Sequence, residues 1–190
     1  MDVLAKLLRP RSVAVIGASA DPTKTSGRPV SQLLKRSFSG AIYPVNPKVS
    51  RIAALTCYPN ISSLPAVPDV AILLLGAERA HQAARELAAI GTGAAIVLAS
   101  GYGEVGEEGA RRQQQLIESA GSMRILGPNT IGLVNLTDSI VLSVSGLGEA
   151  LAAHGALILE ETKATLGEND GPEQSVSIDG IAIKIRLRKQ

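Results

Sequence analysis

Five short apolar segments that alternate with helical patterns constrain the fold of this 190-residue chain most strongly. Strands are predicted at residues 12–16, 41–45, 70–75, 94–98 and 124–126, and helices at 2–8, 28–37, 78–90 and 107–120. Strands that alternate with helices at this spacing form a parallel sheet with right-handed crossovers and helices on both faces. The chain is therefore predicted to be a doubly wound α/β protein.

The composition fits this fold and excludes some functions. Hydrophobic residues make up 45% of the chain but aromatic residues only 2%, so the core must be built from Ala, Val, Ile and Leu. So few aromatic rings argue against single-strand nucleic-acid binding by stacking. The net charge of +2, with no basic run before the last seven residues, predicts no nucleic-acid partner.

The cellular setting is predicted from what the chain lacks. Cys57 is the single cysteine, which excludes a disulfide within the chain and fits a reducing compartment. No apolar run is long enough to cross a membrane, and the N-terminus lacks the layout of a signal peptide. We expect a cytoplasmic protein that does not bind a membrane.

The pattern changes near residue 145. Residues 1–145 are predicted to form the α/β domain, and residues 146–190 a linker followed by a β-hairpin. The hairpin is expected over residues 175–188, around the two-residue turn Asp179-Gly180. Apolar and charged side chains alternate along its second arm, as in a half-buried strand.

Ligands of doubly wound sheets bind at the carboxyl ends of the strands. Gly17 permits a tight turn after the first strand, where loop amides, Ser19 and Lys24 can hold a phosphate. The second strand ends in Val45-Asn46-Pro47-Lys48. A nicotinamide-binding fold needs Asp or Glu here for the ribose hydroxyls, whereas Lys48 suits a phosphate. An ordinary strand-to-helix turn and a solvated lysine are the plainer readings of the two loops.

Two further strand ends carry glycine. Four glycines follow the fourth strand in residues 99–109, which indicates a loop pressed close to a neighbour, while Glu107 and Glu108 fit the start of a helix. Gly127-Pro128-Asn129 ends the fifth strand, and the Asn129 side chain could donate to a carbonyl or phosphate. Alone, each of these two motifs could be an ordinary cap or turn.

Taken in order, five segments resemble one family. They are Pro10–Ser19, Gly40–Lys48, Pro68–Ile72, Ser100–Gly109 and Leu126–Asn135. The chain is similar over residues 3–144 to the N-terminal coenzyme A (CoA)-binding domain of ADP-forming acyl-CoA synthetases of the acetate–CoA ligase type. It is more distantly similar to succinyl-CoA synthetase α subunits. The resemblance implies a Rossmann-like CoA-binding domain.

The resemblance also implies where CoA or acyl-CoA would lie. The first loop would hold phosphates, Lys48 would meet the nucleotide end, the fourth strand's loop would line the adenine or pantetheine path, and the fifth would lie near the thiol. The predicted CoA-binding residues are Gly17, Ala18, Ser19, Ala20, Lys24, Asn46, Pro47, Lys48, Ala99, Ser100, Gly101, Gly127, Pro128 and Asn129. No catalytic and no metal-ligating residue is predicted.

The chain departs from its full-length relatives after this domain. Those relatives continue with a domain that carries a phosphorylated histidine and with an ATP-grasp domain. The histidines here are His81, expected on a helix surface, and His154, expected in a linker without a supporting motif. Cys57 is expected to be an inert, half-buried thiol.

Three functions therefore remain open. The first is a CoA-binding component of an ADP-forming acyl-CoA ligase that works with an ATP-grasp partner subunit and is not catalytically complete alone. The second is a stand-alone CoA-binding sensor or regulator, and the third a nicotinamide-linked oxidoreductase. A homo-oligomer is also left open.

Overall fold

The computed structural model describes residues 3–135, 138–145, 174–178 and 181–185. The chain divides into two units, Met1–Ser145 and Gly146–Gln190. The helices are α1 (Val3–Leu8), α2 (Arg28–Lys35), α3 (Ala77–Ala89) and α4 (Glu107–Ala120), with the 3-10 turns η1 (Ile61–Ser63) and η2 (Gly103–Val105). The strands are β1 (Ser12–Ile16), β2 (Ala41–Val45), β3 (Arg51–Ile52), β4 (Leu55–Thr56), β5 (Val70–Leu73), β6 (Ala94–Val97), β7 (Arg124–Leu126), β8 (Gly132–Asn135), β9 (Ile140–Ser143), β10 (Gln174–Ile178) and β11 (Ile181–Ile185).

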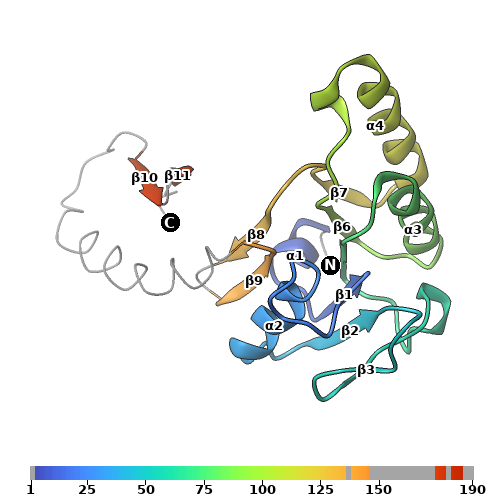
Figure 1. Ribbon diagram of the computed structural model, residues 1–190, viewed down its shortest axis with the longest axis vertical. Coiled ribbons are helices and arrows are strands. Elements are labelled where there is room, and N and C mark those ends of the chain that lie inside the picture. The colour runs from blue at the N-terminus through green and yellow to red at the C-terminus, as the bar shows by residue number, and fades with distance from the viewer. Residues whose placement is uncertain (1–2, 136–137, 146–173, 179–180, 186–190) are drawn as a thin grey trace. The chain divides into compact units, whose positions relative to one another are not determined.

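The first unit is built on a five-stranded sheet in the order β2-β1-β5-β6-β7, and every pair in it is parallel (Figure 1). The chain runs outward from β1 to β2 and then returns past β1 to β5. The direction of winding therefore reverses between β1 and β5, which is where doubly wound folds bind ligands. The predicted Rossmann-like parallel sheet is confirmed, as is the antiparallel strand pair β10–β11 near the C-terminus.

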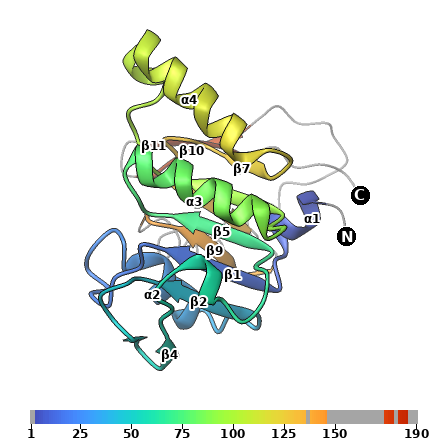
Figure 2. The same cartoon turned by 90° about the vertical axis from the view of Figure 1, so that its right-hand side faces the viewer.

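One face of the sheet packs against α3 and α4, which lie side by side (Figure 2). Neighbouring alanines of β1, β5 and β6, Ala14, Ala71 and Ala95, share this face and are fully buried. Ala80 and Ala84 of α3 belong to the same core. Small side chains on both sides allow α3 to lie close to the sheet, so a dense core forms here with Tyr102 as its largest buried side chain.

The other face packs against α2 and the antiparallel β8–β9 hairpin. Val30 and Leu33 of α2 and Ile140 and Leu142 of β9 are buried against it. This hairpin was not predicted from the sequence, because each of its strands has only four residues. The segment Asn135–Ile140 separates two short apolar runs and, read as a turn, would have indicated it.

The remaining differences from prediction are small. The predicted strands and helices have their centres where expected, and their ends differ by one or two residues, as at β5 and α2. The two-residue strands β3 and β4 were not predicted. The turn Asp179-Gly180 and His154 lie outside the described residues. No described helix is long and apolar enough to cross a membrane.

Candidate functional site

Hydrogen bonds join the predicted site residues into two pairs of loops at the carboxyl edge of the sheet. The Gly17 amide donates to the Val45 carbonyl over 2.9 Å, which ties the loop after β1 to the end of β2. The Asn129 amide donates to the Ala99 carbonyl over 2.9 Å, which ties the loop after β7 to the loop after β6. The end of β5 separates the two pairs in the sheet.

Most amides at the start of the loop after β1 already donate within the described chain. The amides of Gly17 and Ala18 both donate to the Val45 carbonyl, and the Ser19 amide donates to the Ser26 carbonyl. Among these four residues, only Ala20 has an amide outside the hydrogen bonds of the described chain. The prediction that loop amides hold a phosphate therefore stays a prediction, in which the Ala20 amide is the available donor among these four residues.

Two glycines of this loop are required by close backbone contacts. Gly17 has φ +84°, and a Cβ there would lie 2.8 Å from the Leu74 carbonyl oxygen after β5. A Cβ on Gly27 would lie 1.9 Å from the Asp21 carbonyl oxygen. Gly27 was not predicted as a site residue, yet it closes the loop immediately before α2.

Side chains of the same loop largely satisfy one another. The Ser19 hydroxyl accepts from the Asp21 amide over 3.1 Å, and the Asp21 carboxylate accepts from the amide and hydroxyl of Thr23. These bonds, the Thr23 hydroxyl first, hold the pKa of Asp21 below its ordinary value. Lys24 Nζ lies 3.9 Å from Asp21 Oδ2, so the charge of Lys24 is partly balanced within the loop.

The loop after β2 contains an asparagine whose side chain bonds within the protein and a lysine whose side chain is exposed. Asn46 Nδ2 donates to the Ala18 carbonyl over 2.7 Å, and Asn46 Oδ1 accepts from the Lys48 amide over 2.9 Å. Asn46 therefore joins the two loops, and Pro47 is exposed. The Lys48 side chain is exposed and has no ion pair within the described residues, so its charge is available to a ligand.

The glycine-rich loop after β6 is pressed against its own chain. Gly101 has φ +92°, and its amide donates to Glu104 over 2.6 Å while its carbonyl accepts from Arg112. A Cβ on Gly109 would lie 1.6 Å from the Tyr102 carbonyl oxygen. The glycines are thus explained by close contacts within the loop itself. At the strand end, the Ser100 side chain is polar and exposed.

The loop after β7 turns sharply at Gly127. Gly127 has φ +101°, its peptide bond to Pro128 is cis, and a Cβ would lie 2.5 Å from the Val97 carbonyl oxygen. Asn129 also has a positive φ, of 53°. Its side chain is exposed and has no hydrogen-bond partner among the described residues, so it can meet a ligand.

The charges at this edge suit an anionic ligand. Lys48 and Arg28 are exposed cations, and Arg28 also donates to the Val144 carbonyl. The carboxylates of Asp21 and Glu104 are occupied by hydrogen bonds from their own loops, and those bonds hold the pKa of Glu104 below its ordinary value. The residues present therefore fit a phosphorylated ligand such as CoA.

The described residues show no cluster suited to a metal ion and no prepared thiol nucleophile. No group of three or more His, Cys, Asp or Glu side chains is placed to hold a metal among them. Cys57 is buried, its thiol faces the Asn46 carbonyl at 3.8 Å, and desolvation raises its pKa. A raised pKa reduces the thiolate fraction, which fits the predicted inert thiol.

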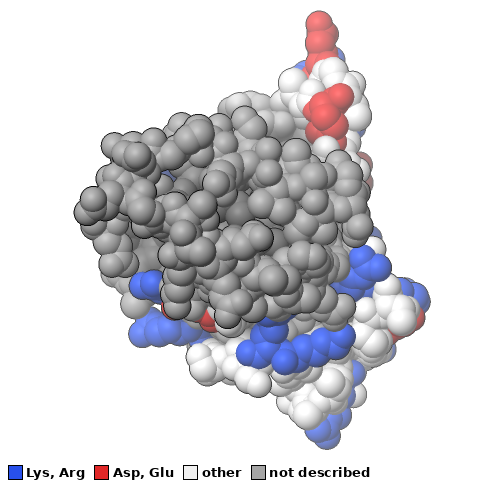
Figure 3. Space-filling model, turned by 90° about the vertical axis from the view of Figure 1, so that its left-hand side faces the viewer, with Lys and Arg blue, Asp and Glu red and all other residues white. Residues whose placement is uncertain are grey.

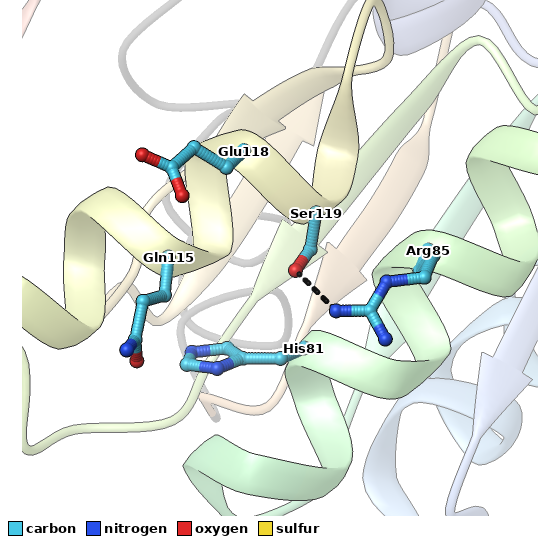
Figure 4. Close-up of a pocket in the computed structure, with 5 residues that line it drawn as sticks. All are labelled: His81, Arg85, Gln115, Glu118 and Ser119. Carbon is cyan, nitrogen blue, oxygen red and sulfur yellow. Dashed lines mark hydrogen bonds between the residues drawn. The ribbon is translucent and has the colours of Figure 1, made fainter.

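His81 lies in a polar cavity of about 380 Å³ between α3 and α4 (Figure 4). Arg85 donates to the Ser119 hydroxyl across this cavity over 3.4 Å. His81 is half-buried and its Nε2 is enclosed. Its imidazole ring is therefore less exposed than expected for a residue on a helix surface. Desolvation first, and then Arg112 and Arg85, lower its pKa, which favours a neutral ring.

Comparison with known proteins decides the family. Residues 11–135 match the family described as CoA binding domain, and they span the sheet and all the predicted site residues. The chain belongs to the CoA-binding domain family. The prediction of a coenzyme A-binding domain is thereby confirmed, whereas the role of each predicted site residue stays a prediction.

Curated relatives of this CoA-binding domain are ADP-forming ligases. The chain is 39% identical over 142 residues to acetate–CoA ligase [ADP-forming] II of Archaeoglobus fulgidus, a match that covers 74% of this chain and 21% of the relative. It is 31% identical over 187 residues to the alpha subunit of acetate–CoA ligase [ADP-forming] II of Pyrococcus furiosus, covering 95% of this chain and 41% of that subunit. The chain thus spans well under half the length of these relatives.

A solved structure shares the fold. The chain superposes with a TM-score of 0.71 and 29% identity on acetyl-coenzyme A synthetase 1 of Ca. Korarchaeum cryptofilum, in complex with phosphate and ADP. The match covers 83% of this chain and 37% of that one. The resemblance inferred from five ordered motifs is therefore confirmed in both sequence and structure.

Proposed function

We propose that this chain is the CoA-binding component of an ADP-forming acyl-CoA synthetase. The complete enzyme would convert an acid, CoA and ATP into acyl-CoA, ADP and phosphate. The phosphohistidine and ATP-grasp parts of that reaction are not found in residues 1–145 and would come from elsewhere. The partner is therefore proposed to be an ATP-grasp subunit or domain, and the cytoplasmic location stays a prediction.

One observation supports this function above all others. The domain match covers residues 11–135, and the relatives that align with it are ADP-forming ligases or their alpha subunits. The alignment with the Pyrococcus furiosus subunit extends over 95% of this chain, beyond the α/β domain. These relatives do not favour the stand-alone sensor, and the family match does not favour the nicotinamide-linked oxidoreductase.

The chain's own residues would bind and orient CoA at the carboxyl edge of the sheet. Lys48, exposed beside the end of β2, is proposed to pair with a phosphate at the nucleotide end. The Ala20 amide would donate to the diphosphate, and the side chains of Ser100 and Asn129 would line the path toward the thiol. When bound, CoA supplies the thiol that accepts the acyl group.

Calorimetry with the full chain tests the binding step. We expect CoA to bind more tightly than dephospho-CoA, because Lys48 is exposed and has no described ion pair, and NAD to bind weakly or not at all. Tighter binding of NAD, or equal binding of all three compounds, would show that the CoA assignment is wrong.

Reconstitution tests the enzymatic role. The chain alone should form no acyl-CoA from acid, CoA and ATP, whereas addition of the phosphohistidine and ATP-grasp parts of a related ligase should restore product formation. ADP must appear in a one-to-one ratio with acyl-CoA. Absence of product with every such addition, despite measurable CoA binding, would contradict the ligase role and leave only the binding role.

A further inference from the structure

The polar cavity between α3 and α4 is separate from the predicted CoA site. Its volume is about 380 Å³, and it is lined by His81 and Arg85 from α3 and by Gln115, Glu118 and Ser119 from α4 (Figure 4). None of the five belongs to the predicted CoA-binding residues. All five side chains are polar and would lose hydrogen bonds to water under an apolar ligand, so the cavity suits a polar molecule.

The hydrophobic core beneath the two helices holds the walls of this cavity in place. Ala84 of α3 and Leu116 and Ala120 of α4 are buried in the same core cluster. The His81 ring packs against the fully buried Tyr102, with ring centroids 5.8 Å apart. A ligand would therefore meet side chains that stand on packed helices, which lowers the ordering cost of binding.

Arg85 brings to the cavity a cation that has no ion pair among the described residues. Its described hydrogen bond goes to the Ser119 hydroxyl over 3.4 Å, which is long for such a bond. On α4, by contrast, Arg111 and Arg112 lie 3.6 and 3.8 Å from the carboxylate oxygens of Glu108. A guanidinium group has five N–H donors and matches the two oxygens of a carboxylate. Arg85 is therefore suited to bind the carboxylate of a ligand.

Glu118 contributes the single negative charge among the side chains that line the cavity. Its Oε1 accepts from Gln114 Nε2 over 3.1 Å, and no cation forms an ion pair with this carboxylate in the part of the chain that the structure describes. A carboxylate attracts an ammonium group and repels a second anion. One cation and one anion in the lining thus favour a ligand that carries both charges.

The acidic start of α4 does not change this local balance. Glu107 and Glu108 lie in the first turn of α4, and acidic side chains gather over α4 on the face shown in Figure 3, away from the Lys and Arg side chains at its other end. At a rise of about 1.5 Å per residue, Glu108 lies about 15 Å from Glu118 along the helix, beyond the screening length of about 8 Å at physiological salt. The nearest charges for a ligand are therefore those of the lining.

We propose that this cavity binds a small zwitterion, a free α-amino acid with a polar side chain. Arg85 would bind the carboxylate and Glu118 the ammonium group. Gln115 and His81 would bind the polar side chain, since an amide and a neutral imidazole both donate and accept hydrogen bonds. The volume lies in the range of about 300–1,000 Å³ that is usual for small-molecule sites. The proposal rests on this cavity alone and does not depend on the ligase role.

Amide NMR of the full chain with L-glutamine tests the proposal. L-Glutamine carries both charges and a side-chain amide, whereas glutaramate lacks only the α-amine and 4-aminobutanamide lacks only the carboxylate. We expect saturable shifts at the amides of Gln115 and Ser119 with L-glutamine, and binding about tenfold weaker with each analogue. Equal binding of all three compounds, or no saturable shift up to about 10 mM L-glutamine, would overturn the proposal.

Two further observations locate the ligand and test its charge. Inorganic phosphate should cause no saturable shift at Gln115, because Glu118 repels an anion that brings no ammonium group. Saturable binding of phosphate there would indicate a simple anion site and would contradict the zwitterion. L-Glutamine shifts confined to Ala20 and Lys48 would show binding at the predicted CoA site instead, and would equally overturn the proposal.

Arg85→Gln tests the carboxylate contact. The variant should weaken L-glutamine binding about tenfold, since a charged donor is lost. The matched control is Arg79→Gln, because Arg79 is exposed on the same helix and does not line the cavity. An equal loss in both variants would mean that net charge alone attracts the ligand, which would contradict a defined site.

Glu118→Gln is the sharper variant, because it keeps the shape of the side chain and an acceptor for Gln114. It should bind glutaramate at least as tightly as L-glutamine, since the partner of the ammonium group is lost. The matched control, Glu107→Gln on the same helix, should keep the tenfold preference for L-glutamine. An unchanged preference in Glu118→Gln, with an unchanged melting temperature to show that it folds, would overturn the proposal.

Discussion

The two edges of the parallel sheet use their loops differently. At the carboxyl edge, internal hydrogen bonds occupy most of the polar groups, as where the Gly17 and Ser19 amides donate within the chain. Gly27 leaves no room there for a side chain, because a Cβ would collide with the Asp21 backbone. At the amino edge, Ser37 and Ser39 keep hydroxyls without described partners beside several arginines. Glycine-rich loops thus indicate tight backbone packing first, and a ligand must use the groups that this packing leaves over.

The carboxyl edge leaves few polar groups for a ligand. The carboxyl edge keeps the Ala20 amide and the side chains of Lys48, Ser100 and Asn129 for a ligand. These groups are few and spread over several loops, which fits an extended molecule better than a single compact phosphate. At the amino edge, by contrast, polar side chains such as Ser37 and Ser39 line one cavity.

The largest expected effect tests whether the carboxyl-edge glycines are structural. Gly27 and Gly76 both precede a helix as its N-cap, but a Cβ would meet the Asp21 backbone at 1.9 Å in the first case and nothing within 4 Å in the second. Serine is a favoured N-cap residue, so Gly27→Ser does not remove the cap of the helix. The variant should still destabilise the fold by about 2–3 kcal/mol, because the added side chain would overpack the loop. Gly76→Ser should change stability by less than about 0.5 kcal/mol.

Urea unfolding of both variants measures this difference. Equal effects at Gly27 and Gly76 would show that the loop after β1 yields easily, and the assignment of its glycine to packing would then be wrong.

A smaller effect on stability is expected at Tyr102, in the loop that follows β6. Tyr102 is fully buried, and its hydroxyl has no hydrogen-bond partner within the described chain. Burial raises the pKa of this phenol, so the group stays neutral. Tyr102→Phe removes an unsatisfied polar atom and keeps the ring, so stability should rise by up to about 1 kcal/mol.

Thermal and urea unfolding of Tyr102→Phe provide the measurement, with Tyr58→Phe as the control, since the Tyr58 ring is only half-buried. A clear loss of stability in Tyr102→Phe would show that the hydroxyl has a hydrogen-bond partner. It would contradict the view that Tyr102 stabilises the fold through burial of its ring alone.

The smallest expected effect concerns the pKa values of two carboxylates, Asp21 at the carboxyl edge and Asp138 at the amino edge. The Thr23 hydroxyl is the main cause of the lowered pKa of Asp21, whereas the bond from the charged Arg9 is the main cause at Asp138. Both carboxylates therefore contribute stability above their ordinary pKa of 3.8 and lose it as the pH falls below that value. Because salt screens exposed charges, added NaCl should raise the pKa of Asp138 more than that of Asp21.

A carboxyl-carbon NMR titration at low and high NaCl measures both groups at once. Thr23→Val should raise the pKa of Asp21 and leave Asp138 unchanged, and Arg9→Gln should do the reverse. A larger salt response at Asp21 would contradict the contrast between the two edges.

Most of the fold could be predicted from the sequence because parallel strands buried on both faces need continuous apolar runs, as in Val13–Ile16 and Val70–Leu73. The β8–β9 hairpin was missed because an apolar run of four residues fits several structures, and only packing against α2 decides among them. The structure of the β8–β9 segment, which covers the second face, thus depends on tertiary contacts and not on local sequence.

The site could be predicted only in part. The sequence placed Gly17 and Lys48 at adjacent strand ends, and the sheet brings their loops together. It could not show that Asn46 joins the two loops or that three amides are already used, because these bonds depend on backbone paths several residues apart. The cavity at the amino edge has no sequence motif, since its residues come from three separate loops.

We propose that the carboxyl edge holds CoA through Lys48 and the few donors left beside it. Calorimetry of CoA and dephospho-CoA against the unaltered chain and Lys48→Ala tests it most directly. We predict that the unaltered chain prefers CoA and that Lys48→Ala reduces this preference by about threefold to fivefold, as for an exposed ion pair. The same preference in both proteins, with Arg111→Ala as the charge control, would contradict a phosphate contact at Lys48.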